Sequence, residues 1–110
     1  MKTEATTAQF IDVFAALADA NRQALLLKLD ASQSRSITEL AGDLPLTRQG
    51  VTKHLRALER AGLARSARSG RETRFLAEPG ALREAAGYLE RISGQWDQAL
   101  ERLRQHVEDQ

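Results

Sequence analysis

The residues that start and stop helices between positions 36 and 76 leave few folds open to this chain of 110 residues. From position 36 the sequence reads Ser-Ile-Thr-Glu. It fits a capping box, in which serine and glutamate satisfy amides at the start of a helix. Pro45 cannot continue that helix, and Thr47 can cap the next one only two residues later. Two helices joined by so short a turn predict a helix-turn-helix over residues 36–62.

The second helix of this pair is predicted to have a buried apolar stripe and a basic outer face. The stripe has helical spacing and consists of Val51, Leu55 and Leu58. Gly62 stands where a glycine closes a helix by taking a positive φ. After it the sequence period changes from helical to alternating, and two arginine-bearing arms flank Ser69-Gly70. Residues 63–76 are therefore predicted to form a β-hairpin wing with a two-residue turn at Ser69-Gly70.

Helices are also predicted before this segment. A short mobile tail at 1–6 is expected to lead into a helix at about 7–17. The buried stripe of that helix consists of Phe10, Val13, Phe14 and Leu17. Asp19 can cap a second helix over 21–29, and the small polar residues at 30–35 predict a loop.

A long final helix is predicted over residues 80–107, with Pro79 at its first position. Its apolar seam is spaced by threes and fours and consists of Leu82, Ala85, Leu89, Ile92, Trp96, Leu100, Leu103 and Val107. At 1.5 Å per residue this seam is about 38 Å long, which outruns so small a core. We therefore expect the helix to pair with a second copy of the chain.

Positive charge is concentrated in residues 46–76. That segment has eight basic residues against two acidic ones, a formal charge of +6. Because the whole chain carries +1, the remaining residues carry −5. Such an asymmetry creates a local field that attracts a polyanion, although the chain as a whole is nearly neutral.

Composition excludes several classes of protein. The chain has no cysteine, which excludes disulfides, thiolate metal sites and iron–sulfur clusters. No apolar run approaches the ~20 residues that span a bilayer, and no signal peptide is recognised, so a cytoplasmic protein without a membrane partner is expected. No catalytic motif is present either. We predict one domain over residues 1–110, with no catalytic residues and no cofactor.

In three places the sequence resembles the ArsR/SmtB family of bacterial winged helix-turn-helix regulators. These motifs are Leu17-Ala18-Asp19-Ala20-Asn21-Arg22, then Ile37-Thr38-Glu39-Leu40-Ala41, and the run from Thr47 to Leu58 followed by Ala61-Gly62-Leu63. The resemblance implies a mainly α fold with a small β-hairpin wing, and a homodimer built on the helices at 7–17 and 80–107. It also implies that each subunit presents a recognition helix and a wing to operator DNA, and that the protein is a repressor released by an effector.

The chain departs from the metal-sensing branch of that family, which places cysteines near the positions of Ala41, Gly42 and Asp43. None of these three residues is a soft ligand, so sensing of arsenic, cadmium or lead at that position is excluded. A small-molecule effector of another kind stays open.

Ten residues are predicted to contact double-stranded DNA: Thr47, Arg48, Gln49, Thr52, Lys53, His54, Arg56, Arg68, Ser69 and Arg71. Arginine can bind guanine and glutamine can bind adenine with paired hydrogen bonds, which favours Arg48 and Gln49 as readers of base edges. The wing tip is expected on phosphates or in the minor groove. His54 is expected to bind phosphate or pack beside Arg56. The alternative is a basic face that is merely solvated.

The predicted dimer interface consists of Phe10, Phe14, Leu89, Ile92, Trp96, Leu100 and Leu103. Trp96 is interpreted first as a packing anchor and second as the lining of an effector pocket. Two other functions remain open. One is a winged-helix module for protein–protein assembly, and the other is a metal-responsive regulator using His106 and Asp109. Because metal sites need about four ligands, we favour a solvent-exposed histidine at that position and predict no metal site.

Overall fold

The computed structural model describes residues 2–109, with side chains from residue 10 onward. Within this range the elements are α1 (Lys2–Leu17), α2 (Ala20–Lys28), β1 (Arg35–Ser36), α3 (Ile37–Ala41), α4 (Arg48–Arg60), β2 (Ala64–Ser69), β3 (Glu72–Ala77) and α5 (Pro79–Glu108). The strands form one antiparallel sheet in the order β1-β3-β2. A mainly helical chain with a small β-hairpin confirms the predicted fold class.

One hydrophobic core holds the helix-turn-helix, α1, α2 and the sheet together. Its largest fully buried side chains are Phe75, Leu25, Leu40, Leu55, Leu58, Leu63, Val13 and Val51. The inward stripe of α4 is fully buried, as its spacing predicted. Phe75 of β3 belongs to the same core, so the hairpin and the second helix of the motif pack against one hydrophobic cluster.

Side-chain caps fix the starts of three helices, as the sequence predicted. Asp19 accepts hydrogen bonds from two amides at the start of α2. Ser36 and Glu39 form the complete capping box of α3. The Thr47 hydroxyl accepts from the Gly50 amide at 3.0 Å and begins α4 at Arg48. These caps set where the two helices of the motif begin, and hence which residues face outward.

Two predicted helix boundaries were wrong. Helix α1 begins at Lys2 rather than at residue 7, so residues 2–6 are helical, while Met1 lies outside the described residues. Helix α3 ends at Ala41, before the predicted stop at Pro45. Gly42 ends it by taking a φ of +41°, a conformation that strains any residue with a Cβ.

Two predictions in the strands also need correction. Arg35 was placed in a loop, but it forms strand β1 with Ser36, and the two residues pair with Phe75 and Arg74 of β3. The predicted cap at Ser36 holds alongside this pairing. The hairpin turn lies at Gly70-Arg71, one residue later than predicted, because Ser69 pairs with Glu72 across the hairpin. Gly70 has a φ of +65°, whereas no residue other than glycine has a positive φ among the described residues. This is the φ pattern of a type II′ hairpin turn.

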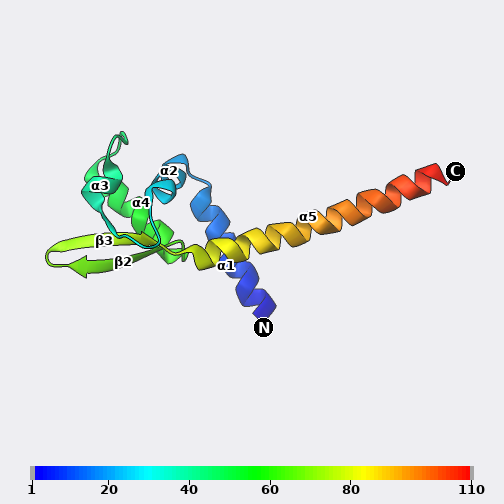
Figure 1. Cartoon of the computed structure of the whole chain (residues 1–110), viewed down its shortest axis with the longest axis horizontal. Coiled ribbons are helices and arrows are strands. Elements are labelled where there is room, and N and C mark those ends of the chain that lie inside the picture. Colours follow the sequence, from blue (N-terminus) through cyan, green and yellow to red (C-terminus); the bar gives the residue numbers. More distant parts are fainter. Residues whose placement is uncertain (1, 110) are drawn as a thin grey trace.

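Helix α5 leaves the compact part of the molecule as a long arm (Figure 1). The extents are 70 × 34 × 22 Å and the radius of gyration is 18.8 Å, against about 13 Å for a compact domain of this length. Of the α5 seam, Ala85 is buried, but Trp96 is 66% exposed and Leu100, Leu103 and Val107 are about as exposed. No helix in the described part of the chain is long and apolar enough to cross a membrane.

The capping box of α3 gives a direct stability prediction. The Ser36 side chain is buried and accepts from the Glu39 amide at 3.1 Å. Ser36→Ala is therefore expected to lower the free energy of unfolding by about 1 kcal/mol, which urea denaturation would measure. Ser93→Ala, at an exposed position within α5, is the matched control and should cost nothing, since alanine favours a helix interior. Equal stability of the two variants would show that the cap contributes little.

Candidate nucleic-acid interface

The predicted DNA-contacting residues of α4 lie on its exposed side, near the start of the helix. Burial of Val51, Leu55 and Leu58 turns Arg48, Gln49 and Lys53 to the outside. Thr47 is exposed as well, and its hydroxyl caps the helix. Thr52 is half-buried, and its hydroxyl donates to the Arg48 carbonyl at 2.9 Å. The unpaired amides of the helix start also favour negative groups at this end.

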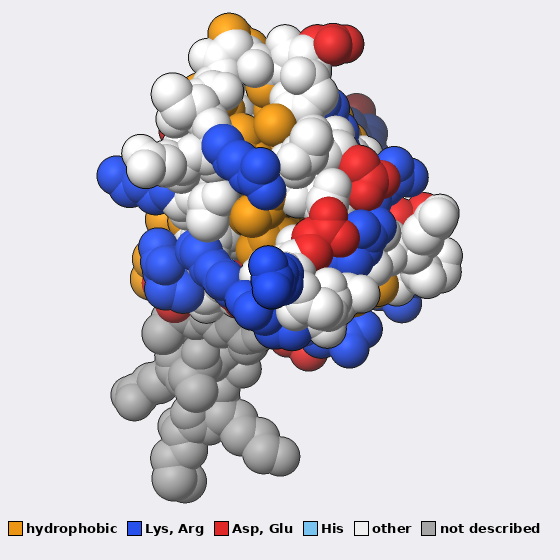
Figure 2. Space-filling model, turned by 90° about the vertical axis from the view of Figure 1, so that its left-hand side faces the viewer, with side chains coloured by type: hydrophobic (Ala, Val, Ile, Leu, Met, Phe, Trp, Pro, Cys, Tyr) orange, Lys and Arg blue, Asp and Glu red, His pale blue; other side chains and the backbone are white. Residues whose placement is uncertain are grey.

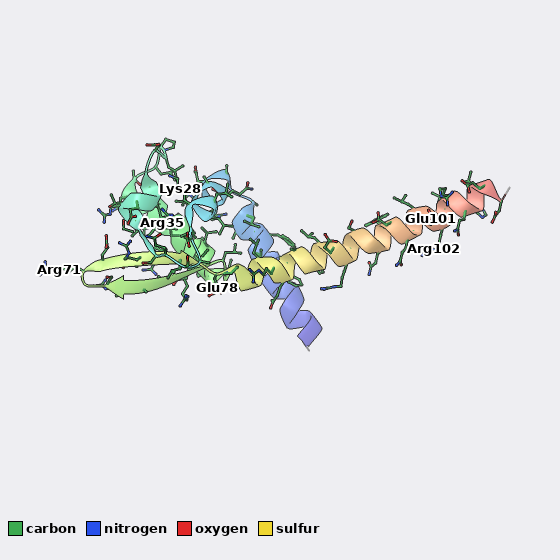
Figure 3. The ribbon with its side chains drawn as sticks, viewed as in Figure 1. Lys28, Arg35, Arg71, Glu78, Glu101 and Arg102 are labelled. Atoms are coloured by element: carbon green, nitrogen blue, oxygen red, sulfur yellow. The ribbon has the colours of Figure 1, made fainter. Side chains whose placement is uncertain are left out.

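The predicted wing contacts lie at the other edge of the same end of the molecule. Arg68, Ser69 and Arg71 are all exposed around the hairpin turn. Figure 3 shows Arg71 at the tip, pointing away from the body. Seen end-on in Figure 2, lysine and arginine side chains form a band across this end. The structure thus brings the exposed positive charge of the helix-turn-helix and the wing to one end, opposite the free end of α5.

Arg56 is exposed, but its guanidinium is held by an intramolecular network. Its guanidinium donates to Glu59 Oε1 at 2.8 Å and to the Ser66 hydroxyl at 3.2 Å. It also lies over the Phe75 ring, 5.3 Å from the centroid. Ser66 donates to Glu59 Oε2 from both its amide, at 3.1 Å, and its hydroxyl, at 2.5 Å. The network therefore joins α4 to strand β2.

Burial raises the pKa of Glu59, but hydrogen bonds from Ser66 and Arg56 outweigh burial, and its net pKa lies below the usual value. Because the folded-state pKa is depressed, this carboxylate contributes stability at neutral pH. That contribution is lost as the pH falls through the folded-state pKa.

Arg74 forms a second connection, from β3 to the start of the helix-turn-helix. It pairs with Glu72 at 2.9 Å and with Glu39 at 3.1 Å, and it donates to the Ser34 carbonyl at 2.9 Å. A hydrogen bond from the Ser36 amide is the main cause of the lowered pKa of Glu39, to which the Arg74 charge adds.

Ion pairs within the chain occupy three of the eight basic residues of this segment. Arg56, Arg65 and Arg74 pair with carboxylates, Arg65 with Glu78 at 3.5 Å. Five basic residues of the segment form no ion pair within the described part of the chain: Arg48, Lys53, Arg60, Arg68 and Arg71. Four of these five belong to the predicted DNA contacts.

His54 lies against α2, a contact that the sequence did not predict. Its Nδ1 atom is 3.5 Å from the Arg22 guanidinium. Arg22 also donates to the carbonyls of Ala16 and Ala15, at 2.6 and 3.3 Å, and so caps the end of α1. An open pocket of about 250 Å³ adjoins this junction and is lined by Asp12, Ala15, Ala16, Arg22, Ala57, Arg60 and Ala61.

The predicted dimer residues divide into two groups. Phe10 is buried within its own subunit, where its ring stacks on Tyr88 of α5 at 4.7 Å, and Phe14 lies 6.3 Å from the same ring. Ile92 is half-buried. The other four are exposed on α5: Leu89, Trp96, Leu100 and Leu103. Ile11 of α1, which the prediction omitted, is 61% exposed.

Among the described residues, no three histidine, cysteine or carboxylate side chains gather as a metal site would require. His106 lies in the last turn of α5, on the arm far from the basic end.

Sequence reasoning missed the contacts of Glu59, Ser66 and Arg22. One signal was available for the first of these, since Glu59 is one of only two acidic residues in a strongly basic segment. Its partner Ser66 lies seven residues later, on a different element, and no local pattern marks that pairing.

Comparison with known proteins identifies the family. A helix-turn-helix domain family matches residues 17–67. An uncharacterized HTH-type transcriptional regulator, YuzN of Bacillus subtilis (strain 168), is 38% identical over 65 residues, which cover 54% of this chain and 71% of that protein.

Solved structures extend the likeness to nearly the whole chain. An ArsR-like transcriptional regulator from Rhodococcus sp. RHA1 is 40% identical, with a TM-score of 0.84 and coverage of 96% of both chains. A homodimeric winged helix-turn-helix DNA-binding domain from Mycobacterium bovis, 24% identical, shares the fold, with a TM-score of 0.64 over 84% of this chain and 83% of its own. The chain therefore belongs to the ArsR-like family of winged helix-turn-helix transcriptional regulators.

Proposed function

We propose that the protein is a homodimeric, sequence-specific repressor that binds a palindromic operator in double-stranded DNA. The observation that carries this proposal is the position of the exposed, unpaired basic residues. Those of α4 and those of the wing tip lie at one end of the molecule, while the exposed apolar seam of α5 extends from the opposite side. One surface suits a polyanion and the other suits a second copy.

In the proposed complex the start of α4 enters the major groove. Arg48 and Gln49 read base edges there, while Thr47, Thr52 and Lys53 contact bases or backbone. Arg68, Ser69 and Arg71 of the wing contact the phosphates or the adjacent minor groove. His54 and Arg56 belong to the edge of this interface, since each already has an intramolecular partner.

The proposed dimer buries the seam of α5 together with the exposed side of α1. Ile11 adds to the predicted set, while Phe10 and Phe14 hold α1 against α5 through the Tyr88 ring. Two-fold symmetry then presents two recognition helices to half-sites about 10 bp apart or a multiple of that. A dimer seated on a promoter excludes the polymerase, and an effector that favours another dimer geometry releases it.

Selection of bound fragments from a random duplex library, at 150 mM salt, tests the proposal. We expect an imperfect palindrome to emerge, and transcription in vitro from a promoter containing it to fall when the protein is added. Recovery of no duplex, with capture of an acidic protein partner instead, would favour the assembly-module alternative. A rise in transcription would make the protein an activator.

The roles proposed for α4 and for the wing are separable by substitution. Gln49→Ala should change the preferred base at one position of each half-site, because a bidentate base contact discriminates by about 1–3 kcal/mol. Arg71→Ala should weaken all duplexes to a similar degree. Fluorescence anisotropy on the selected operator and on single-base variants would measure both effects. If both variants lose the same affinity on every duplex, the assignment of base reading to α4 is wrong.

A further inference from the structure

We infer that Glu59 is a positioning residue of the DNA interface, which fixes the wing relative to α4 so that both meet the duplex as one rigid unit. The inference rests on the proposed DNA binding, and it concerns a residue that itself contacts no DNA. It also gives Arg56 a role inside the protein, as the cation that holds the Glu59 carboxylate in place.

The geometry of Glu59 is that of a clamp between two elements. One carboxylate oxygen accepts from Arg56, which precedes it by one helical turn on α4. The other accepts both the amide and the hydroxyl hydrogen of Ser66 on β2. Arg56 closes the ring by donating to the Ser66 hydroxyl as well. With its side chain 31% exposed, Glu59 is the only acidic residue of α4.

The clamp holds β2 at Ser66, the last residue of that strand that is not exposed before the wing tip. Along β2, residues 67–69 beyond Ser66 are exposed and have no core contact to direct them. At about 3.3 Å per residue, the three residues from Ser66 to Ser69 extend the arm by roughly 10 Å. A small rotation at Ser66 is therefore amplified at Arg68 and Arg71.

Charge alone gives no reason for a carboxylate at this position. A negative group beside Arg56 weakens the attraction of the surface for phosphates. Glu59→Gln removes one negative charge per subunit, so electrostatics alone predicts tighter binding to any duplex. The clamp predicts the opposite sign for the operator, because the neutral amide loses the ion pair with Arg56 and one of its acceptor atoms.

The test compares Glu59→Gln with a matched control on the operator selected by the unaltered protein. Glu101→Gln makes the same change of charge and also breaks an i,i+3 pair with an arginine, Arg104, on the far arm of α5 (Figure 3). We expect Glu59→Gln to weaken operator binding about tenfold, a typical coupling within a hydrogen-bonded network, with equal or tighter binding to random duplex. Glu101→Gln should leave operator affinity unchanged or slightly raised.

A double-mutant cycle with Arg71→Ala isolates the positioning role. If Glu59 orients the wing, Arg71→Ala should cost several-fold less affinity in the Glu59→Gln background than in the unaltered protein. Ser66→Ala removes two of the clamp's hydrogen bonds without changing charge, and it should show the same coupling. It also serves as the test variant if Glu59→Gln fails to fold by circular dichroism.

Hydrogen exchange of the wing amides supplies a readout that needs no DNA. Exchange should accelerate at residues 66–69 in Glu59→Gln and not in Glu101→Gln. The inference is overturned if Glu59→Gln binds the operator as tightly as the control and keeps the full cost of Arg71→Ala. Failure of the unaltered protein to bind any duplex would instead overturn the proposed function.

Discussion

Raising the salt concentration from 50 to 200 mM is expected to weaken operator binding by about 10³–10⁵-fold. Each subunit offers four positively charged residues predicted to contact DNA that form no ion pair with another described residue: Arg48, Lys53, Arg68 and Arg71. A dimer carries two sets, within the range of 6–10 phosphate contacts for which counterion release produces such a loss. A plot of log affinity against log salt, from anisotropy titrations, measures it.

The slope of that plot tests the wing separately. Arg71→Ala removes one cation at each of two wing tips, so the slope should become shallower by about 2. Arg102→Ala removes the same charge on the arm of α5, at the far end of the molecule (Figure 3), and should leave the slope unchanged. Equal changes for the two variants would mean that the wing tip contributes only to the overall charge of the protein.

The helix starts could be read from the sequence because the signals that set them are local. Asp19, Ser36 and Thr47 each bond to amides two or three residues ahead, and the structure confirms all three. The inward stripe of α4 follows from helical spacing alone, and all three of its predicted residues are buried in the core. Local chemistry therefore placed the recognition helix and its exposed face.

The prediction errors arise where pairing with a distant segment, or the local backbone conformation, determines the bounds of an element. Strand β1 exists because β3, nearly forty residues later, pairs with it, and two polar residues carry no strand signal of their own. Helix α3 ends at Ala41 because Gly42, which follows it, adopts a positive φ that residues with a Cβ rarely take. The hairpin turn moved by one residue because register depends on pairing along both strands.

The same distinction applies to the interface. Exposure of the basic side chains followed from the sequence, but their partners did not. Glu59 reaches Ser66 on β2, and Arg74 reaches Glu39 on α3. In each pair the two residues lie on different elements, which become neighbours only when the chain folds. Composition gave the formal charge of the segment, and the fold decided which of its arginines form ion pairs with carboxylates.

The other large effect is expected at the middle of the α5 seam. Trp96→Glu places a negative charge in the proposed dimer interface. On dimerisation the two glutamate carboxylates would lose their hydration without gaining a cation as partner. We expect the protein to sediment as a monomer at micromolar concentration. Because Trp96 is 66% exposed and outside the hydrophobic core, circular dichroism should show the subunit still folded. Operator affinity should fall by about 10²–10⁴, the avidity lost when two linked half-site contacts become one.

Gln98→Glu is the matched control for that substitution. It adds the same charge two residues away, at an exposed position of α5 that lies off the apolar seam. It should sediment as a dimer and keep nearly full operator affinity, apart from the small effect of one added negative charge far from the basic end. If Trp96→Glu stays dimeric and binds as tightly as Gln98→Glu, the exposed seam is not what joins two copies. The paired half-sites then need another interface, because two recognition helices one turn of duplex apart require a fixed two-fold axis between them.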